Sequence, residues 1–219
     1  MVALDVPALL DTPVGRRHLR QPLGQVVHKA QAVHPWIGLL GIDPLTDLDR
    51  VRVVFCASDL GRPLWLAHGR LDPARFQTGP DQLRKKVEGG FRLYDFTDAG
   101  GTRTTLAPAG DSLVVCDAWP RVLSALRHAA DPGLEAPPAP ALRALLARVD
   151  RRQGLWLAVS FERLGPSGRL KVYFLELVLR PVFKHAASVY GGIRCGVDLR
   201  AEFHFQARND RAAWDLEAA

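Results

Sequence analysis

The chain has 219 residues, of which 47% are hydrophobic, so it is long and apolar enough to form a packed core and is not an intrinsically disordered protein. Its formal net charge is +6, from 29 basic and 23 acidic residues, and arginine supplies most of the basic side chains. The basic residues are scattered along the chain, in short groups near acidic residues or turns such as Arg16-Arg17, Arg84-Lys85-Lys86 and Arg151-Arg152. A net charge of this kind indicates solubility and does not by itself identify a partner.

The three cysteines, Cys56, Cys116 and Cys195, lie far apart in apolar, strand-like segments. An odd count without a close pair argues against a disulfide framework and a zinc site, so we interpret them as small buried hydrophobic residues. Residues 1–7 lack the features of a secretory signal, and no apolar run is long enough to span a membrane. The sequence as it stands predicts a cytoplasmic protein, and an exported one if the gene model has lost an N-terminal signal.

The first half of the chain predicts a strand, two helices, a β-hairpin, a third helix, a three-stranded meander and a fourth helix. Proline favours the first position of a helix, and glycine favours the position just after its end, which sets several of these boundaries. In chain order the elements are a strand over 2–6, helices over 7–18 and 23–40, hairpin strands 51–57 and 64–71, a helix over 72–87, strands 91–96, 102–107 and 112–117, and a helix over 119–129.

A proline-rich segment over 131–140 predicts a linker, because it cannot continue as helix or central strand. It separates a first half, 1–130, from a shorter second half, 141–219, which we expect to pack on the first. The elements predicted after the linker are a helix over 141–149, a strand over 155–163, a turn at 165–168, an apolar helix over 170–187, hairpin strands 189–195 and 199–207, and a final helix from Asn209-Asp210. The fold class is therefore α+β, with antiparallel sheets flanked by helices.

The order strand, helix, hairpin, helix occurs in both halves and predicts a two-fold repeat. Residues 64–67 and residues 155–158 both read Leu-Trp-Leu-Ala, although they fall at different steps of the plan. A looser echo links 70–76 to 208–214, where an acidic cap follows a hairpin strand and an aromatic residue comes four positions later.

Turn and cap signatures distributed over most of the chain carry a resemblance to a known family. The segments 41–51 (GIDPLTDLDRV) and 69–76 (GRLDPARF), together with 154–158 and 190–193, make the sequence similar to a large family of uncharacterised bacterial proteins. The resemblance implies a fold and an N-terminal export signal, with no assigned activity, cofactor or catalytic residue. This chain departs from that pattern because it shows no export signal.

Two groups of polar residues are candidate metal ligands. His28 and His34 are six residues apart on a predicted helix and therefore face different directions, so they do not form a metal pair. Asp43, Asp47 and Asp49 share one loop, but their spacing does not follow the order of an EF-hand. We interpret these aspartates as capping residues.

Catalytic groups and ligand loops are equally sparse. Glu162 and Glu202 lie in predicted strands, where they would act as an acid–base pair only if folding brought them within about 5–10 Å. Ser160 and Ser188 lack a nucleophile elbow. The glycine pairs at 89–90, 100–101 and 191–192 fit turns and form no phosphate-binding motif. No catalytic, cofactor or metal residue is therefore assigned.

Aromatic and basic residues alternate in 91–94 and again in 203–208. On a strand this alternation places Phe203 and Phe205 on one face and His204 on the other, which predicts either a core face or a stacking platform for single-stranded nucleic acid.

Three functions from different classes remain. The leading hypothesis, reached by elimination, is a non-catalytic module that binds a protein or peptide through an open sheet, or that self-associates. The first alternative is a nucleic-acid-binding protein with an arginine-rich surface. The second is a hydrolase whose site is assembled only in space. The sequence leans away from an enzyme but does not exclude one.

Overall fold

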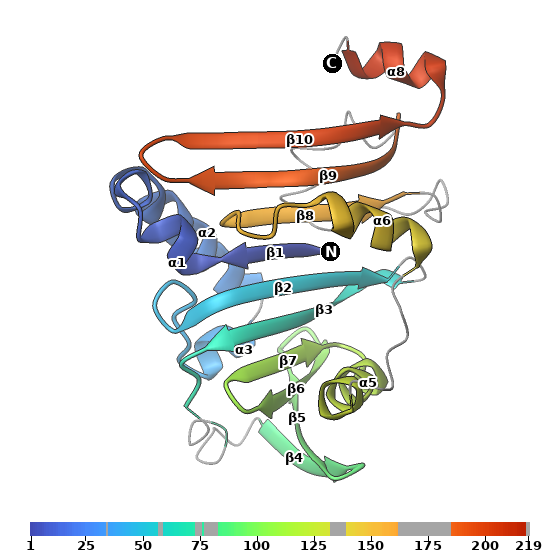
Figure 1. The fold of residues 1–219 in the computed structure, drawn as a ribbon. Coiled ribbons are helices and arrows are strands. Elements are labelled where there is room, and N and C mark those ends of the chain that lie inside the picture. Colours follow the sequence, from blue (N-terminus) through green and yellow to red (C-terminus); the bar gives the residue numbers. More distant parts are fainter. Residues whose placement is uncertain are drawn as a thin grey trace.

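The computed structural model describes residues 1–33, 35–56, 59–72, 76, 83–131, 139–161 and 185–217. Its centre is one ten-stranded sheet with the order β10-β9-β8-β1-β2-β3-β7-β6-β5-β4, in which every described pairing is antiparallel (Figure 1). The predicted α+β class with antiparallel strands and flanking helices is confirmed.

The strands have the bounds β1 Val2–Asp5, β2 Leu48–Cys56, β3 Asp59–Gly69, β4 Leu83–Glu88, β5 Phe91–Thr97, β6 Arg103–Ala109, β7 Ser112–Cys116, β8 Leu155–Ser160, β9 Ala186–Cys195 and β10 Leu199–Ala207. The helices have the bounds α1 Val6–Leu10, η1 Gly15–Leu19, α2 Arg20–Val33, α3 Pro35–Leu39, α5 Trp119–Ala130, α6 Pro140–Arg148 and α8 Asp210–Glu217. The predicted hairpin strands and meander are thus present, with shifted ends.

Helices cover both faces of the sheet (Figure 1). On one face, Trp36 and Ile37 of α3 pack in a buried cluster with Tyr94 and Phe96 of β5. On the other face, α5 packs on the end of the sheet that contains Leu93, and α6 packs on β8 and β9. Because alternate residues of β5 enter opposite clusters, the sheet separates two layers of core.

Strand β1 connects the two parts of the sheet. Val2, Ala3 and Leu4 pair with β2 on one side and with β8 on the other. The chain's first strand therefore lies in the middle of the sheet, between strands that come much later in the sequence.

The prediction of a helix over 72–87 is wrong for its C-terminal end. Residues 83–88 form β4, which makes a hairpin with β5. Gly89 and Gly90 both have positive φ, +57° and +83°, which is the geometry that two-residue hairpin turns require and glycine supplies. The glycine pair is the turn of a hairpin and not the end of a helix.

The N-terminal helices also differ from the prediction. The helix expected over 7–18 ends at Leu10 and is followed by the π-helical turn η1. Pro13 lacks the N–H that a continuous helix needs at this point, and the Thr12 side chain bonds the Leu9 carbonyl instead, at 3.2 Å. The helix expected over 23–40 is likewise divided, into α2 and α3, with Pro35 at the start of α3.

Several predictions fall partly or wholly outside the described residues. They include most of the linker, the end of the strand expected over 155–163, and nearly all of the helix expected over 170–187. Where that helix can be compared, it is wrong, because β9 begins at Ala186. The two-fold repeat and the division into halves stay predictions.

Candidate functional site

The C-terminal hairpin ends the sheet at β10, which among the described strands pairs only with β9 (Figure 1). Strand β10 is nine residues long, and seven of its side chains are exposed, with Phe203 and Ala207 half-buried. An edge strand carries backbone N–H and C=O groups that face away from its sheet and are free to pair with another strand. We call this strand and its outward side the β10 edge.

Large apolar side chains are exposed on and beside the β10 edge. Leu199 is 50% exposed and Phe205 is 41% exposed, and both lie on the same face of the strand because their numbers differ by an even count. Val197, in the turn before β10, is 88% exposed, and Trp214 of α8 is 76% exposed. Among the described residues, four of the five exposed large hydrophobic side chains therefore belong to the C-terminal segment.

The opposite face of β10 is polar and is ordered by contacts with β9. His204 stacks on Tyr190, with ring centroids 4.7 Å apart. The His204 Nε2 atom lies 2.9 Å from Glu202 Oε1. The Arg148 guanidinium of α6 lies over the same Tyr190 ring, 6.0 Å from its centroid. The strand thus presents an apolar face and a charged face.

Close backbone approach fixes the hairpin. Gly191 of β9 has φ +148°, and a Cβ atom there would lie 2.1 Å from the Glu202 carbonyl oxygen and 2.7 Å from the Phe203 Cα. Both are backbone atoms that cannot turn away, so only glycine fits. The glycine pair at 191–192, for which a turn was predicted, therefore lies within strand β9.

The aromatic alternation predicted for this strand is confirmed. Phe203 and Phe205 pair with Gly191 and Val189, whereas His204 pairs with Tyr190 on the other face. Phe205 is exposed, so this face is not wholly a core face. The sequence missed that β10 is at an edge, because edge position depends on which strands pair and not on the pattern within one strand.

Of the aspartates considered as metal ligands, Asp43 and Asp47 share one turn, whereas Asp49 lies in β2 and not in the predicted loop. His28 is exposed on α2, and His34 lies outside the described residues. Asp43 and Asp47 accept backbone N–H groups, from Leu45 at 2.9 Å and from Asp43 at 3.0 Å respectively, as expected of capping residues. Within the described residues, no group of three or more histidine, cysteine or acidic side chains is placed to hold a metal ion.

Three of the four residues considered as catalytic groups lie in described strands, Ser160 in β8, Ser188 in β9 and Glu202 in β10. Glu202 contacts His204, and Glu162 lies outside the described residues. Ser188 is buried and donates to Gln206 Oε1 at 3.1 Å, while Ser160 lies opposite it on β8.

The prediction that the cysteines are buried and unpaired is confirmed for Cys116 and Cys195. Cys116 and Cys195 are buried and free, whereas the side chain of Cys56 lies outside the described residues. Burial, as the largest cause, raises the pKa of the Cys116 thiol, so this thiol is not activated.

A serine–histidine contact that the sequence did not reveal occurs across β3 and β7. His68 Nδ1 lies 3.2 Å from Ser112 Oγ. In the described part of the chain no carboxylate contacts the His68 ring, so the third member of a hydrolytic triad is lacking there.

Comparisons of the chain with protein-family models, with curated proteins and with solved structures found no match. The resemblance to the exported bacterial family stays a prediction. No helix in the described ranges has the length and apolar character needed to cross a membrane.

Proposed function

We propose that the protein is a non-catalytic interaction module that binds an extended polypeptide segment along the β10 edge. The observation that carries the proposal is the combination of a nine-residue edge strand with exposed Leu199 and Phe205. When a peptide adds to a sheet edge, main-chain hydrogen bonds supply affinity and alternate side chains supply specificity. The apolar face of β10 offers such contacts to every second residue of an added strand.

A second copy of the chain is a further candidate for the occupant of the edge. If two β10 strands pair antiparallel about a two-fold axis at Phe203, Glu202 of each copy lies opposite His204 of the other. The same register places Ala201 opposite Phe205, so a small side chain meets a large one. A carboxylate opposite an imidazole can form a hydrogen bond, and this contact and the large–small pair both favour cross-strand association.

The experiment compares matched substitutions at the two edges of the sheet. Tagged wild-type protein, Phe205→Lys and Val87→Lys are used to capture partners from cells, after nuclease treatment, and bound proteins are quantified by mass spectrometry. Phe205 is 41% exposed on β10 and Val87 is 66% exposed on β4, so each variant adds one charge at an exposed edge position. We expect a nuclease-resistant partner to be reduced at least tenfold by Phe205→Lys and unchanged by Val87→Lys.

Hydrogen exchange then locates the contact. In the reconstituted complex, β10 amides should gain protection while β4 amides should not. A partner that binds all three proteins equally would contradict the proposal, and so would protection confined to β4. Loss of captured material with nuclease would favour the nucleic-acid alternative.

Sedimentation velocity of the purified protein distinguishes the two occupants. A concentration-dependent dimer that Glu202→Lys and Phe205→Lys weaken, and Val87→Lys does not, would assign the edge to a second copy. A monomer at all concentrations would leave the edge to a different polypeptide.

A further inference from the structure

A row of paired residues crosses the middle of the sheet on the face that carries α5 and α6. Trp156 of β8 pairs with Ala3 of β1, which pairs with Arg52 of β2, which pairs with Leu66 of β3. Directly opposite residues in antiparallel strands point to the same face. Trp156 packs under α6 and Leu66 packs against the α5 cluster, so Arg52 lies between the two helices.

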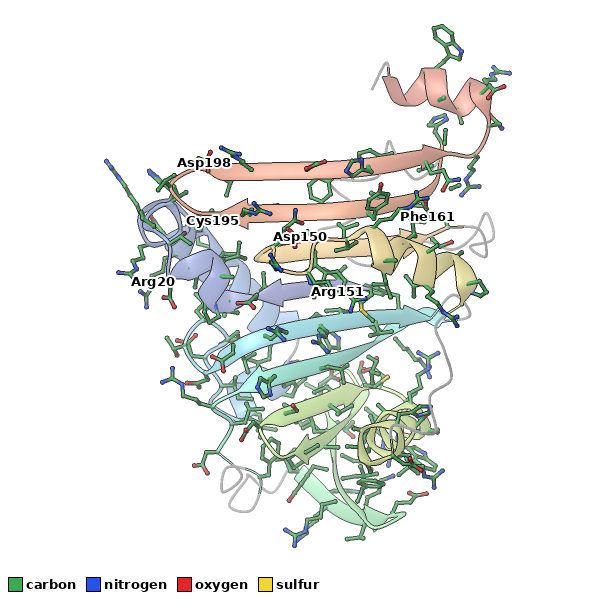
Figure 2. The ribbon with its side chains drawn as sticks, in the orientation of Figure 1. Arg20, Asp150, Arg151, Phe161, Cys195 and Asp198 are labelled. Atoms are coloured by element: carbon green, nitrogen blue, oxygen red, sulfur yellow. The ribbon has the colours of Figure 1, made fainter. Side chains whose placement is uncertain are left out.

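A pocket of about 350 Å³ opens over this row. Its apolar wall includes Leu66, Leu146 and Trp156, and three arginines line it, namely Arg50, Arg52 and Arg151. Figure 2 shows Arg151, from the loop between α6 and β8, in front of the central strands. The volume lies at the lower end of the range typical of small-molecule sites. We call this cavity the arginine pocket.

The charges in the arginine pocket are not balanced. Arg50 pairs with Asp5, with Nη2 and Oδ2 3.2 Å apart. Arg151 donates to the Leu146 carbonyl oxygen at 3.3 Å, which leaves its charge uncompensated. The Arg52 side chain has neither a hydrogen bond nor an ion pair with any described residue. Two of the three guanidinium charges therefore have no described carboxylate partner.

The environment of Arg52 is unfavourable to its charge. Although Arg52 is exposed, its pKa is lowered, first by partial burial of the guanidinium and then by the positive charges of Arg50 and Arg151. A guanidinium held among like charges gains stability when an anion enters, since the anion supplies the missing opposite charge. The free pocket is thus prepared for an anionic ligand.

We propose that the arginine pocket binds a small phosphomonoester, with its phosphate between Arg52 and Arg151 and its apolar part against Leu66 and Trp156. A phosphate monoester carries a charge of about −1.5 to −2 at neutral pH, which matches the two uncompensated guanidinium groups. Guanidinium groups also offer paired N–H donors to phosphate oxygens. A nucleic-acid backbone supplies one negative charge at each phosphate and matches the site less well.

The test is calorimetric titration of the full chain with phenyl phosphate, with inorganic phosphate and phenol as comparison ligands. We expect one saturable site for phenyl phosphate, weaker binding of inorganic phosphate, and no binding of phenol. Arg52→Gln should weaken phenyl phosphate at least tenfold. Arg92→Gln is the matched control, because Arg92 is an exposed strand arginine on β5 outside the pocket.

Thermal unfolding separates a binding defect from a folding defect. Without ligand, Arg52→Gln should unfold at the same temperature as wild type or higher, because the substitution removes like-charge repulsion. Phenyl phosphate should raise the midpoint of wild type and of Arg92→Gln, but not that of Arg52→Gln.

Three results would overturn the proposal. One is the absence of saturable phenyl phosphate binding to folded wild-type protein. Another is an equal loss of affinity in Arg52→Gln and Arg92→Gln. The third is binding of a single-stranded oligonucleotide that Arg52→Gln abolishes, while phenyl phosphate neither binds nor competes.

Discussion

The two edges of the sheet are built differently. Strand β4 is six residues long and carries four charged side chains in the sequence Leu-Arg-Lys-Lys-Val-Glu, whereas the nine residues of β10 carry two charged side chains. Short length and lysine side chains are devices by which proteins prevent unwanted pairing at a sheet edge. The β4 edge is the shorter of the two and carries lysines, whereas the β10 edge is longer and carries none, which supports the proposal that another strand adds at β10.

The β4 edge is also tied to its neighbours by a polar network. Asp95 of β5 is buried and accepts hydrogen bonds from Arg103 and from Thr105 Oγ1, the latter at 2.7 Å. Lys86 Nζ of β4 lies 3.8 Å from Asp95 Oδ2 and 4.4 Å from the Trp119 ring centroid. Charged side chains therefore bind β4 to the neighbouring elements and also protect its edge from pairing with another strand. Strand β10, by contrast, is held mainly by its hairpin with β9.

The first prediction concerns the glycines next to each edge and has the largest expected effect. Gly191→Ala should lower the free energy of unfolding by about 2–4 kcal/mol, because its Cβ would overlap the backbone of β10. Gly90→Ala, in the β4 hairpin turn, has positive φ but nothing within 4 Å of a Cβ, so about 1–2 kcal/mol is expected. Denaturant unfolding measures both values. Equal losses of unfolding free energy in the two variants would show that both hairpins are constrained to the same degree at these glycines.

The second prediction concerns Asp95 at the β4 side. Asp95→Asn should cost about 1–3 kcal/mol at neutral pH, because the buried Thr105 hydroxyl and the exposed Arg103 guanidinium both lose a charged acceptor. Burial raises the pKa of the Asp95 carboxyl, but hydrogen bonds from Arg103 and Thr105 and the charges of Lys86 and Arg103 outweigh it and lower the pKa overall.

A lowered native pKa fixes the sign of the pH effect. The stabilisation by Asp95 is complete above the usual carboxyl pKa of about 4 and is lost as the pH falls through the lower native value. Wild type should therefore lose stability below about pH 4 more steeply than Asp95→Asn. Parallel pH profiles of the two proteins would contradict this account.

The third prediction has the smallest effect and tests the contacts of the Lys86 ammonium group. Lys86→Met retains the length of the side chain but removes this group, which lies over Trp119 and pairs with Asp95, so about 0.5–1 kcal/mol of stability should be lost. The control is Lys85→Met, at a neighbouring exposed position of the same strand, which should change stability by less than about 0.5 kcal/mol. A loss of equal size in both variants would exclude a specific role for Lys86.

Local signals accounted for much of the fold. The meander over 91–117 and the helix after it were predictable because their turns contain glycine at positions with positive φ, such as Gly101 and Gly110. The strand before Gly89-Gly90 was not predictable. A charged run such as Arg84-Lys85-Lys86 is compatible with either a helix or an exposed strand. Its pairing with β5 decides between them.

Neither of the two proposed binding surfaces was predictable in the same way. The alternation Arg50, Val51, Arg52, Val53 indicates two faces of a strand, but it does not show that Arg151, a hundred residues away, shares one of them. That juxtaposition depends on β1 lying between β2 and β8. Likewise, the edge position of β10 follows from the strand order and not from its own residues.

The central position of β1 has a kinetic consequence. Leu4 pairs with Leu155, so the described sheet cannot become continuous until the chain has been synthesised well past α6. Pairings between residues so distant in sequence are slow, because the loop must close before any contact repays its entropy. During synthesis one side of β1 thus stays unpaired, and the nascent chain has a temporary open edge at the place that becomes the middle of the finished sheet.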